Sequence, residues 1–283
     1  MILVTFEYNG TRQAGVLEGE QVRPAGMSMN ALIDGYGSAL CRGDAALPLG
    51  DALPLSAVRL LAPIPDPRQD VLCLGMNYVD HSQEAAQWGK DSFVKNAGKA
   101  VYFSKRAHEI LGPDGEIDGH FDVEEQVDYE CELAVVLGRD AYKVPREEAM
   151  DYVLGYSILN DVSGRELQKA HKQFYFGKSL DTYTVMGPWI VTRDALPQPP
   201  EYDIRCSVNG EARQSSNTRY MIFDVQDVIA DLSRAMTLTA GTIIAMGTPA
   251  GVGMGFDPPR FLKSGDVIRC EIDGIGALKN TVK

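Results

Sequence analysis

The pattern of apolar and polar residues predicts a chain built mainly from short strands. Four apolar runs have the length and composition of buried strands: "VLCLG" (71–75), "AVYFSKR" (100–106), "ELAVVLG" (132–138) and "YSILND" (156–161). Asparagine-glycine or aspartate-glycine pairs predict tight turns at 9–10, 209–210 and 273–274. Many strands with few helices indicate an α+β, β-rich fold rather than a regular series of βαβ units.

Helical signals are fewer. "SGRE" (163–166) predicts a capping box in which Ser163 and Glu166 open a helix that ends near His171. Pro145 suits the start of another helix. In "MIFDVQDVIADLSRAMTL", apolar residues at helical spacing predict an amphipathic helix facing the core: Val225, Val228, Ile229, Leu232 and Met236.

A proline-rich segment divides the chain. Pro63, Pro65 and Pro67 lie in "LAPIPDPRQD", where each proline stiffens the backbone and removes a strand donor. We therefore predict a linker here, with a small N-terminal domain at residues 1–62 and a larger domain at residues 63–283.

Composition and charge narrow the class of protein. The 283 residues carry 27 Lys and Arg against 39 Asp and Glu, a net charge of −12, which disfavours nucleic acid and anionic membranes as partners. Five cysteines without a short paired spacing indicate reduced thiols. No apolar run approaches the roughly 18 residues of a membrane span. We expect a soluble, cytoplasmic protein.

Acidic residues alternate in "VDYECELAVV" (127–136). In a strand, Glu130 and Glu132 share one face with their Cα atoms about 6.6 Å apart, so their carboxylates repel unless a cation lies between them. The alternative is a strand edge that faces water, with Tyr129 and Cys131 packed inward. Asp128 lies on the same face, receives no ligand role, and is expected to face water.

Four further residues are candidates for the same site. Asp161 ends a strand just before a predicted helix, a position that suits a cleft. Together with Glu130 and Glu132 it forms an oxygen-only donor set, which suits Mg²⁺, Mn²⁺ or Ca²⁺ rather than zinc. Lys178 in "FGKSLDT" adds a cationic group. His81 and Glu84 are three residues apart and share a face if this segment is helical.

Two apparent nucleotide motifs lack the context they need. "GKS" (177–179) has Lys172 where a phosphate-binding loop requires glycine. "GVGMG" (251–255) is followed by Pro258 and Pro259, where a dinucleotide site requires the start of a helix. We interpret "GVGMG" as a backbone-flexible loop beside a site.

Five segments together are specific: "DYECELAVVLGRDA", "YSILNDVSGRELQ", "GKSLDTYTVMGPWIVT", "MIFDVQDVIADLS" and "AMGTPAGVG…FLKSGDVIRCEIDGIG". They occur in the order typical of the fumarylacetoacetate hydrolase family, which the chain resembles over roughly residues 70–283. The leading residues resemble the small N-terminal domain of many bacterial members. The resemblance implies a β-roll catalytic domain, usually dimeric, with a divalent cation held by Glu130, Glu132 and Asp161.

The resemblance also assigns roles to individual residues. His81 and Glu84 in "NYVDHSQE" match the pair that activates water in similar members. Lys178 matches the family lysine. Gln168 and Thr248 match positions that bind substrate. Asp80 matches an aspartate that ligates the metal in one branch only, and we leave it outside the ligand set.

The reaction implied by the resemblance is metal-dependent cleavage of a carbon–carbon bond. The substrate is expected to be a 2-oxo acid of the acylpyruvate (2,4-dioxo acid) type, cleaved through a metal-stabilised enolate. Oxaloacetate decarboxylation and isomerisation of 2-hydroxy-diene-dioates need the same enolate and stay open as alternatives. A metal-binding relative that has lost catalysis is the alternative of another class.

The segment 85–106 is expected to set the substrate tail. Lys105 and Arg106 would suit a second carboxylate of the substrate, whereas free surface charge is the preferred interpretation for Lys95.

Overall fold

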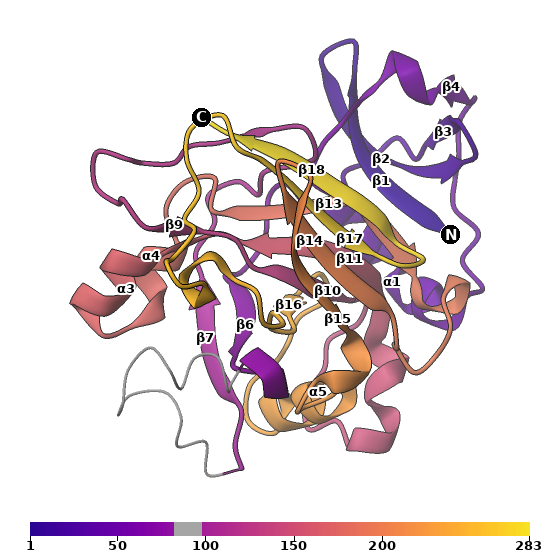
Figure 1. Ribbon diagram of the computed structural model, residues 1–283. Coiled ribbons are helices and arrows are strands. Elements are labelled where there is room, and N and C mark those ends of the chain that lie inside the picture. Colours follow the sequence, from indigo (N-terminus) through magenta and orange to yellow (C-terminus); the bar gives the residue numbers. More distant parts are fainter. Residues whose placement is uncertain (82–97) are drawn as a thin grey trace.

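A large mixed sheet forms the centre of the molecule. The computed structural model describes residues 1–81 and 98–283 (Figure 1). Within these residues an 11-stranded sheet has the order β4-β3-β2-β1-β13-β11-β10-β16-β6-β7, and β5 pairs with β1. Its strands are β1 (Ile2–Tyr8), β2 (Thr11–Glu18), β3 (Gln21–Pro24), β4 (Leu53–Pro54), β5 (Arg59–Leu60), β6 (Val71–Gly75), β7 (Val101–Lys105), β10 (Cys131–Leu137), β11 (Val153–Asp161), β13 (Thr184–Thr192) and β16 (Ile243–Ala245). The predicted β-rich fold is confirmed.

A smaller sheet packs against one face of the large one. Its order is β15-β14-β17-β18-β8, and its strands are β8 (Glu116–Ile117), β14 (Asp203–Val208), β15 (Glu211–Asn217), β17 (Val267–Ile272) and β18 (Gly276–Val282). In Figure 1 its orange and yellow strands cross in front of β10, β11 and β13. A third, two-stranded sheet pairs β9 (Val127–Asp128) with β12 (Ser163–Gly164).

Both faces of β10 are covered, which explains its uninterrupted apolar sequence. Leu133 and Val135 belong to the core shared with the smaller sheet. Ala134 and Val136 point the other way, into a core shared with helix α1 (Met29–Arg42). Polar side chains can therefore enter the interior only where the strand begins, at Glu130 and Glu132.

The first 60 residues extend the large sheet. β1 pairs antiparallel with β13, so that Ile2 lies opposite Val191. Residues 61–65 of the proline-rich segment that follows are buried, and Thr5 Oγ1 donates a hydrogen bond to Pro63 O at 2.6 Å. Main-chain pairing and a common core thus cross the boundary between residues 62 and 63, and the division into two domains stays a prediction.

Two predicted helices are present, whereas α1 and the helix Phe174–Lys178 had not been predicted, and the segment after Pro145 is a 3-10 helix. α5 (Val225–Ser233) starts with a capping box formed by Asp224 and Asp227. Met236 lies beyond this helix and is 42% exposed, so its predicted place in the core is wrong. The other helices are α3 (Arg165–His171), α4 (Phe174–Lys178) and the 3-10 helices Leu55–Ala57, Arg146–Tyr152, Arg193–Ala195, Thr218–Tyr220 and Gly253–Gly255.

The capping box predicted at "SGRE" is wrong. Gly164, not Ser163, precedes α3, and it provides no side-chain cap. Ser163 and Gly164 instead pair with Asp128 and Val127 as strand β12. The Ser163 hydroxyl donates to Asp161 O at 2.9 Å, because the strand pairing holds it away from the helix N-terminus.

No helix in the two described segments has both the length and the apolar character needed to cross a membrane.

We expect that deletion of residues 1–62 yields an insoluble chain, because it would uncover one edge of β13 and the apolar surface beneath α1. The measurement is the soluble fraction after expression, with urea unfolding of any soluble product and the full chain as control. Cooperative unfolding of a soluble 63–283 chain would contradict this expectation and support two independent domains.

Candidate metal centre

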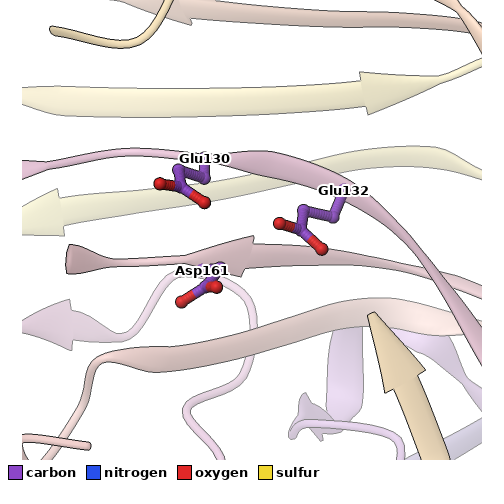
Figure 2. Close-up of side chains that lie close together, drawn as sticks. All are labelled: Glu130, Glu132 and Asp161. Atoms are coloured by element: carbon purple, nitrogen blue, oxygen red, sulfur yellow. The ribbon is translucent and has the colours of Figure 1, made fainter. Parts of the chain in front are cut away.

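Three carboxylates converge at one end of β10 and β11. Glu130 immediately precedes β10, Glu132 lies within it, and Asp161 is the last residue of β11. The antiparallel register places Cys131 opposite Asn160, and Asp161 N donates to Glu130 O at 2.8 Å. One potential ligand atom from each carboxylate lies within 4.8 Å of the others, and all three residues are buried (Figure 2). The geometric part of the sequence prediction is confirmed, and the alternative of a wet strand edge is wrong.

The Glu132 carboxylate is only half satisfied. Its Oε2 accepts a hydrogen bond from Gly247 N at 2.7 Å, whereas its buried Oε1 has no hydrogen-bond partner within the described part of the chain. Burial raises the pKa of Glu132 well above its usual value, and the charges of Asp161 and Glu130 raise it further. An unpaired carboxylate oxygen beside two other carboxylates fits a hard divalent cation.

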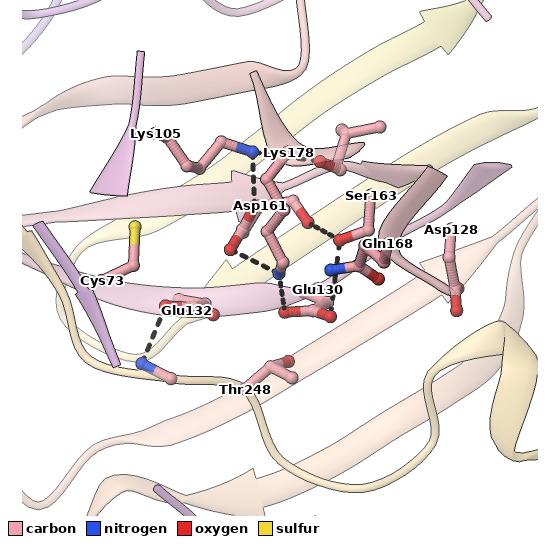
Figure 3. A network of polar contacts seen from close by, with 12 residues as sticks. Cys73, Lys105, Asp128, Glu130, Glu132, Asp161, Ser163, Gln168, Lys178 and Thr248 are labelled. Atoms are coloured by element: carbon pink, nitrogen blue, oxygen red, sulfur yellow. Dashed lines mark hydrogen bonds and ion pairs between the residues drawn. The ribbon is translucent and has the colours of Figure 1, made fainter. Parts of the chain in front are cut away.

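Two buried ammonium groups balance part of this negative charge. Lys178 Nζ lies 2.8 Å from Glu130 Oε2 and 2.6 Å from Asp161 Oδ2 (Figure 3). Burial opposes the charged form of this lysine, but the two carboxylates raise its pKa overall. On the other side of Asp161, Lys105 Nζ pairs with Oδ1.

Arg165 supplies a third cation. Its Nη1 lies 2.7 Å from Glu130 Oε1, and it also donates to Gln168 Oε1 at 3.1 Å. Burial opposes ionisation of Glu130, yet Lys178 and Arg165 lower the pKa of its carboxyl below the usual range. Gln168, expected to bind substrate, therefore lies beside this ion pair.

Lys105 was expected to bind the substrate tail, but its side chain is buried in the interior. Its side chain is 0% exposed, and besides Asp161 it donates to Val162 O at 3.0 Å and Tyr183 O at 2.9 Å. These acceptors use all three ammonium protons, which leaves none for a substrate carboxylate. Lys105 orients Asp161 instead. Arg106 is exposed, and its backbone N–H donates to Ser179 Oγ at 3.0 Å.

Asp128 was expected to face water, and this is wrong. The residue is fully buried, and it accepts a hydrogen bond from Arg165 Nε at 3.0 Å. It also accepts from the backbone N–H groups of Gly253 at 2.6 Å and Met254 at 3.0 Å. Asp128 thus ties the "GVGMG" loop to the arginine that contacts Glu130.

The glycines of this loop permit that close approach. A Cβ atom on Gly253 would lie 2.6 Å from Asp128 Oδ1 and 2.5 Å from Arg260 O. Gly251 has a φ of +100°, and a Cβ there would lie 2.1 Å from Arg213 O. The loop lies beside the site, as expected, but its glycines serve close packing. The sequence shows both Asp128 and the glycine-rich loop, but nothing in it indicated that the two are in contact.

His81 lies at the edge of the same cluster. It is 6% exposed, and its charge is among the influences that lower the pKa of Glu130. The neighbouring Asp80 is exposed, and its Oδ1 accepts from His81 N at 2.8 Å. Glu84, the predicted partner of His81, lies outside the described residues.

Thr248 is buried and contacts the backbone between the two glutamates. Its hydroxyl donates to Cys131 O at 3.0 Å, and it accepts from Gln214 Nε2 at 2.7 Å. Gln214 had not been predicted as a site residue.

Comparison with known proteins identifies the family of this chain. Residues 70–283 match the family model described as "Fumarylacetoacetate (FAA) hydrolase C-terminal". The chain belongs to the fumarylacetoacetate hydrolase family. An oxaloacetate tautomerase of Bacillus subtilis is 45% identical over 228 residues, covering 81% of this chain and 74% of the relative. A mitochondrial oxaloacetate tautomerase of Xenopus laevis is 43% identical over 229 residues, which cover 80% of this chain and 69% of the relative.

Solved structures of the family share the whole fold. A fumarylacetoacetate hydrolase from Exiguobacterium antarcticum is 40% identical, covers 100% of this chain and 99% of its own, and superposes with a TM-score of 0.83. A maleylpyruvate hydrolase from Sphingobium, solved with manganese(II) and pyruvate, is 29% identical with a TM-score of 0.76, over 100% of this chain and 98% of its own. Family membership supports enzymatic activity, and the buried acidic triad could hold a metal ion.

We expect cation affinity to rise with pH. Burial and the neighbouring carboxylates raise the pKa of Glu132, so that a proton and a cation compete for this carboxylate and cation binding displaces protons from it. Below the folded pKa of Glu132, each pH unit should tighten binding by about tenfold. Calorimetric Mn²⁺ titrations at a series of pH values, in buffers of different ionisation enthalpy, would measure both effects. The control Glu132→Gln should bind more weakly and release fewer protons, and a pH-independent affinity in the unsubstituted protein would contradict the prediction.

Asp128→Asn should destabilise the protein by about 3 kcal/mol, because it removes one charge of a buried ion pair. The measurement is the free energy of unfolding in urea. Asp44→Asn is the matched control, since the ion pair of Asp44 with Arg42 is exposed and its loss should change stability by less than about 1 kcal/mol. Equal, small effects of the two substitutions would show that the Asp128–Arg165 contact is not important for stability.

Proposed function

We propose that this protein uses a divalent cation, Mg²⁺ or Mn²⁺, to interconvert the keto and enol forms of oxaloacetate or a closely similar 2-oxo acid. The observation that carries the proposal is the buried triad of Glu130, Glu132 and Asp161 with the unpaired Glu132 Oε1. The names of the two oxaloacetate tautomerases, at 45% and 43% identity, support this reaction.

Each role follows from the position of a side chain. When bound, the cation would act as a Lewis acid toward the 2-oxo acid. Lys178 provides a buried positive charge that can balance negative charge on the substrate. His81 can take the proton from C3 of oxaloacetate and allow a proton to be returned at the 2-oxo oxygen, because an imidazole nitrogen can both accept and donate a proton. Lys105 and Arg165 keep the carboxylates of Asp161 and Glu130 in place.

Hydrolysis of acylpyruvates is the second candidate. It needs the same donors and, in addition, a water molecule activated by His81 with Glu84. The buried position of His81 favours it, and so does the similarity to a maleylpyruvate hydrolase. Decarboxylation of oxaloacetate and isomerisation of diene-dioates use the same donors; relatives of known structure include a 2-hydroxyhepta-2,4-diene-1,7-dioate isomerase at 32% identity. The presence of His81 and Lys178 at the triad disfavours a protein that has lost catalysis.

The small-molecule 2-oxo acid partner, the homodimer and the cytoplasmic location remain predictions. So does the absence of nucleic-acid and membrane partners.

The test separates these reactions by their products. Enol oxaloacetate is mixed with the protein, and its ultraviolet absorbance is followed with Mn²⁺ or with chelator. Pyruvate release is measured in parallel from oxaloacetate and from a panel of acylpyruvates. We expect cation-dependent loss of the enol without pyruvate. Release of pyruvate from acylpyruvates alone would replace the tautomerase proposal with the hydrolase, and release from oxaloacetate would indicate the decarboxylase.

Substitutions identify the groups responsible. Glu130→Ala should abolish cation-dependent activity, and His81→Ala should lower the rate by about 10²–10⁴-fold, as expected for loss of a general acid–base. His108→Ala is the matched control, because His108 is exposed and should leave the rate unchanged. Full activity of His81→Ala would remove the histidine from the mechanism.

A further inference from the structure

A buried glutamine links the smaller sheet to the candidate metal centre. Gln214 lies on β15 and is 1% exposed. Its Oε1 accepts from Cys131 N at 3.1 Å, and its Nε2 donates to Thr248 Oγ1 at 2.7 Å and to Pro249 O at 2.8 Å. Both amide protons and the amide oxygen are therefore used.

The partners of Gln214 belong to two segments that meet at the carboxylates. Cys131 lies between Glu130 and Glu132 in the sequence. Thr248 and Pro249 follow Gly247, whose N–H donates to Glu132 Oε2 at 2.7 Å. The Thr248 hydroxyl closes the connection by donating to Cys131 O at 3.0 Å. One side chain thus fixes the spacing between the strand that carries the glutamates and the loop that orients Glu132.

The backbone of the loop at residues 247–249 has an unusual conformation and is tightly packed. Gly247 has a φ of +89°, and a Cβ there would lie 2.8 Å from Asn77 Cβ. Asn77 holds the preceding residue from the other side, through its Nδ2 to Met246 O at 2.8 Å. Loss of the Gln214 amide should therefore loosen residues 247–249 without releasing the whole loop.

We propose that Gln214 is a positioning residue that sets cation affinity by holding the Gly247 N–H against Glu132. The inference rests on the cation site of the proposed function. Gln214 does not contact the carboxylates and acts through Cys131, Thr248 and Pro249. Groups that orient metal ligands in this way typically change metal affinity by about 10- to 100-fold when removed.

Asn280 provides a matched control. It lies on β18 of the same sheet, is 2% exposed, and its Nδ2 donates to Gly112 O at 2.9 Å and Gly115 O at 3.0 Å. It is a buried amide that joins two segments, but its partners lie outside the candidate metal centre. A loss of stability common to buried amides should appear at both positions, whereas a loss of cation affinity should appear at Gln214 alone.

The test compares Gln214→Met with Asn280→Leu, since both keep similar volume and remove the amide. Mn²⁺ binding is measured by electron paramagnetic resonance of the free ion. Hydrogen exchange of the Gly247 amide is measured in the cation-free protein. We expect the dissociation constant for Mn²⁺ to rise by about 10- to 100-fold in Gln214→Met, with faster exchange at Gly247. Asn280→Leu should unfold at lower urea concentration but bind Mn²⁺ like the unsubstituted protein.

The outcomes separate the two proposals. If the unsubstituted protein fails to bind Mn²⁺, the cation site itself is wrong. If that protein binds and folded Gln214→Met binds equally well, the positioning role of Gln214 is wrong. If Gln214→Met does not fold, Thr248→Val removes the loop side of the same contact, and unchanged Mn²⁺ affinity in that variant would overturn the inference.

Discussion

Burial of like charges is the constraint on which this structure depends. Glu130, Glu132 and Asp161 lie within 4.8 Å of one another in the interior, where an uncompensated carboxylate is costly. Lys178 is shared between two of them. The unpaired oxygen of Glu132 is the part of the cluster that protein groups leave unbalanced, and it marks the place where a divalent cation would relieve the repulsion.

The two packed sheets explain why the cluster lies where it does. Apolar side chains cover both faces of β10 along its length, so charged groups reach the interior only at its first residues. The pairing of β10 with β11 then brings Asp161 to the same end. Contacts from far along the chain complete the arrangement, since Asp128 holds Gly253 and Gln214 holds Thr248. The site is thus an outcome of how both sheets and the glycine-rich loop meet.

The same donor set accounts for the range of reactions among relatives. A triad of carboxylates, a buried lysine and a histidine can support enolisation of a 2-oxo acid, and hydrolysis adds an activated water. The relatives include tautomerases, an isomerase and a hydrolase on one fold. Fold and family therefore support an enzymatic activity, while the reaction depends on the groups of the site. The proposal of tautomerisation rests on two relatives named oxaloacetate tautomerases, whereas the family resemblance had implied hydrolysis.

Local patterns in the sequence were enough to predict most of the longer strands, the start of helix α5 and the three carboxylates. Alternation in "VDYECELAVV" fixes which side chains share a face, because that geometry is a property of the strand alone. Three features were not predicted: the burial of Asp128, the ion pair between Lys105 and Asp161, and the contacts of Gln214. Each depends on segments 34 to 125 residues apart in sequence. The pairing of strands and the packing of sheets bring such segments together, and no local pattern records the distance between them.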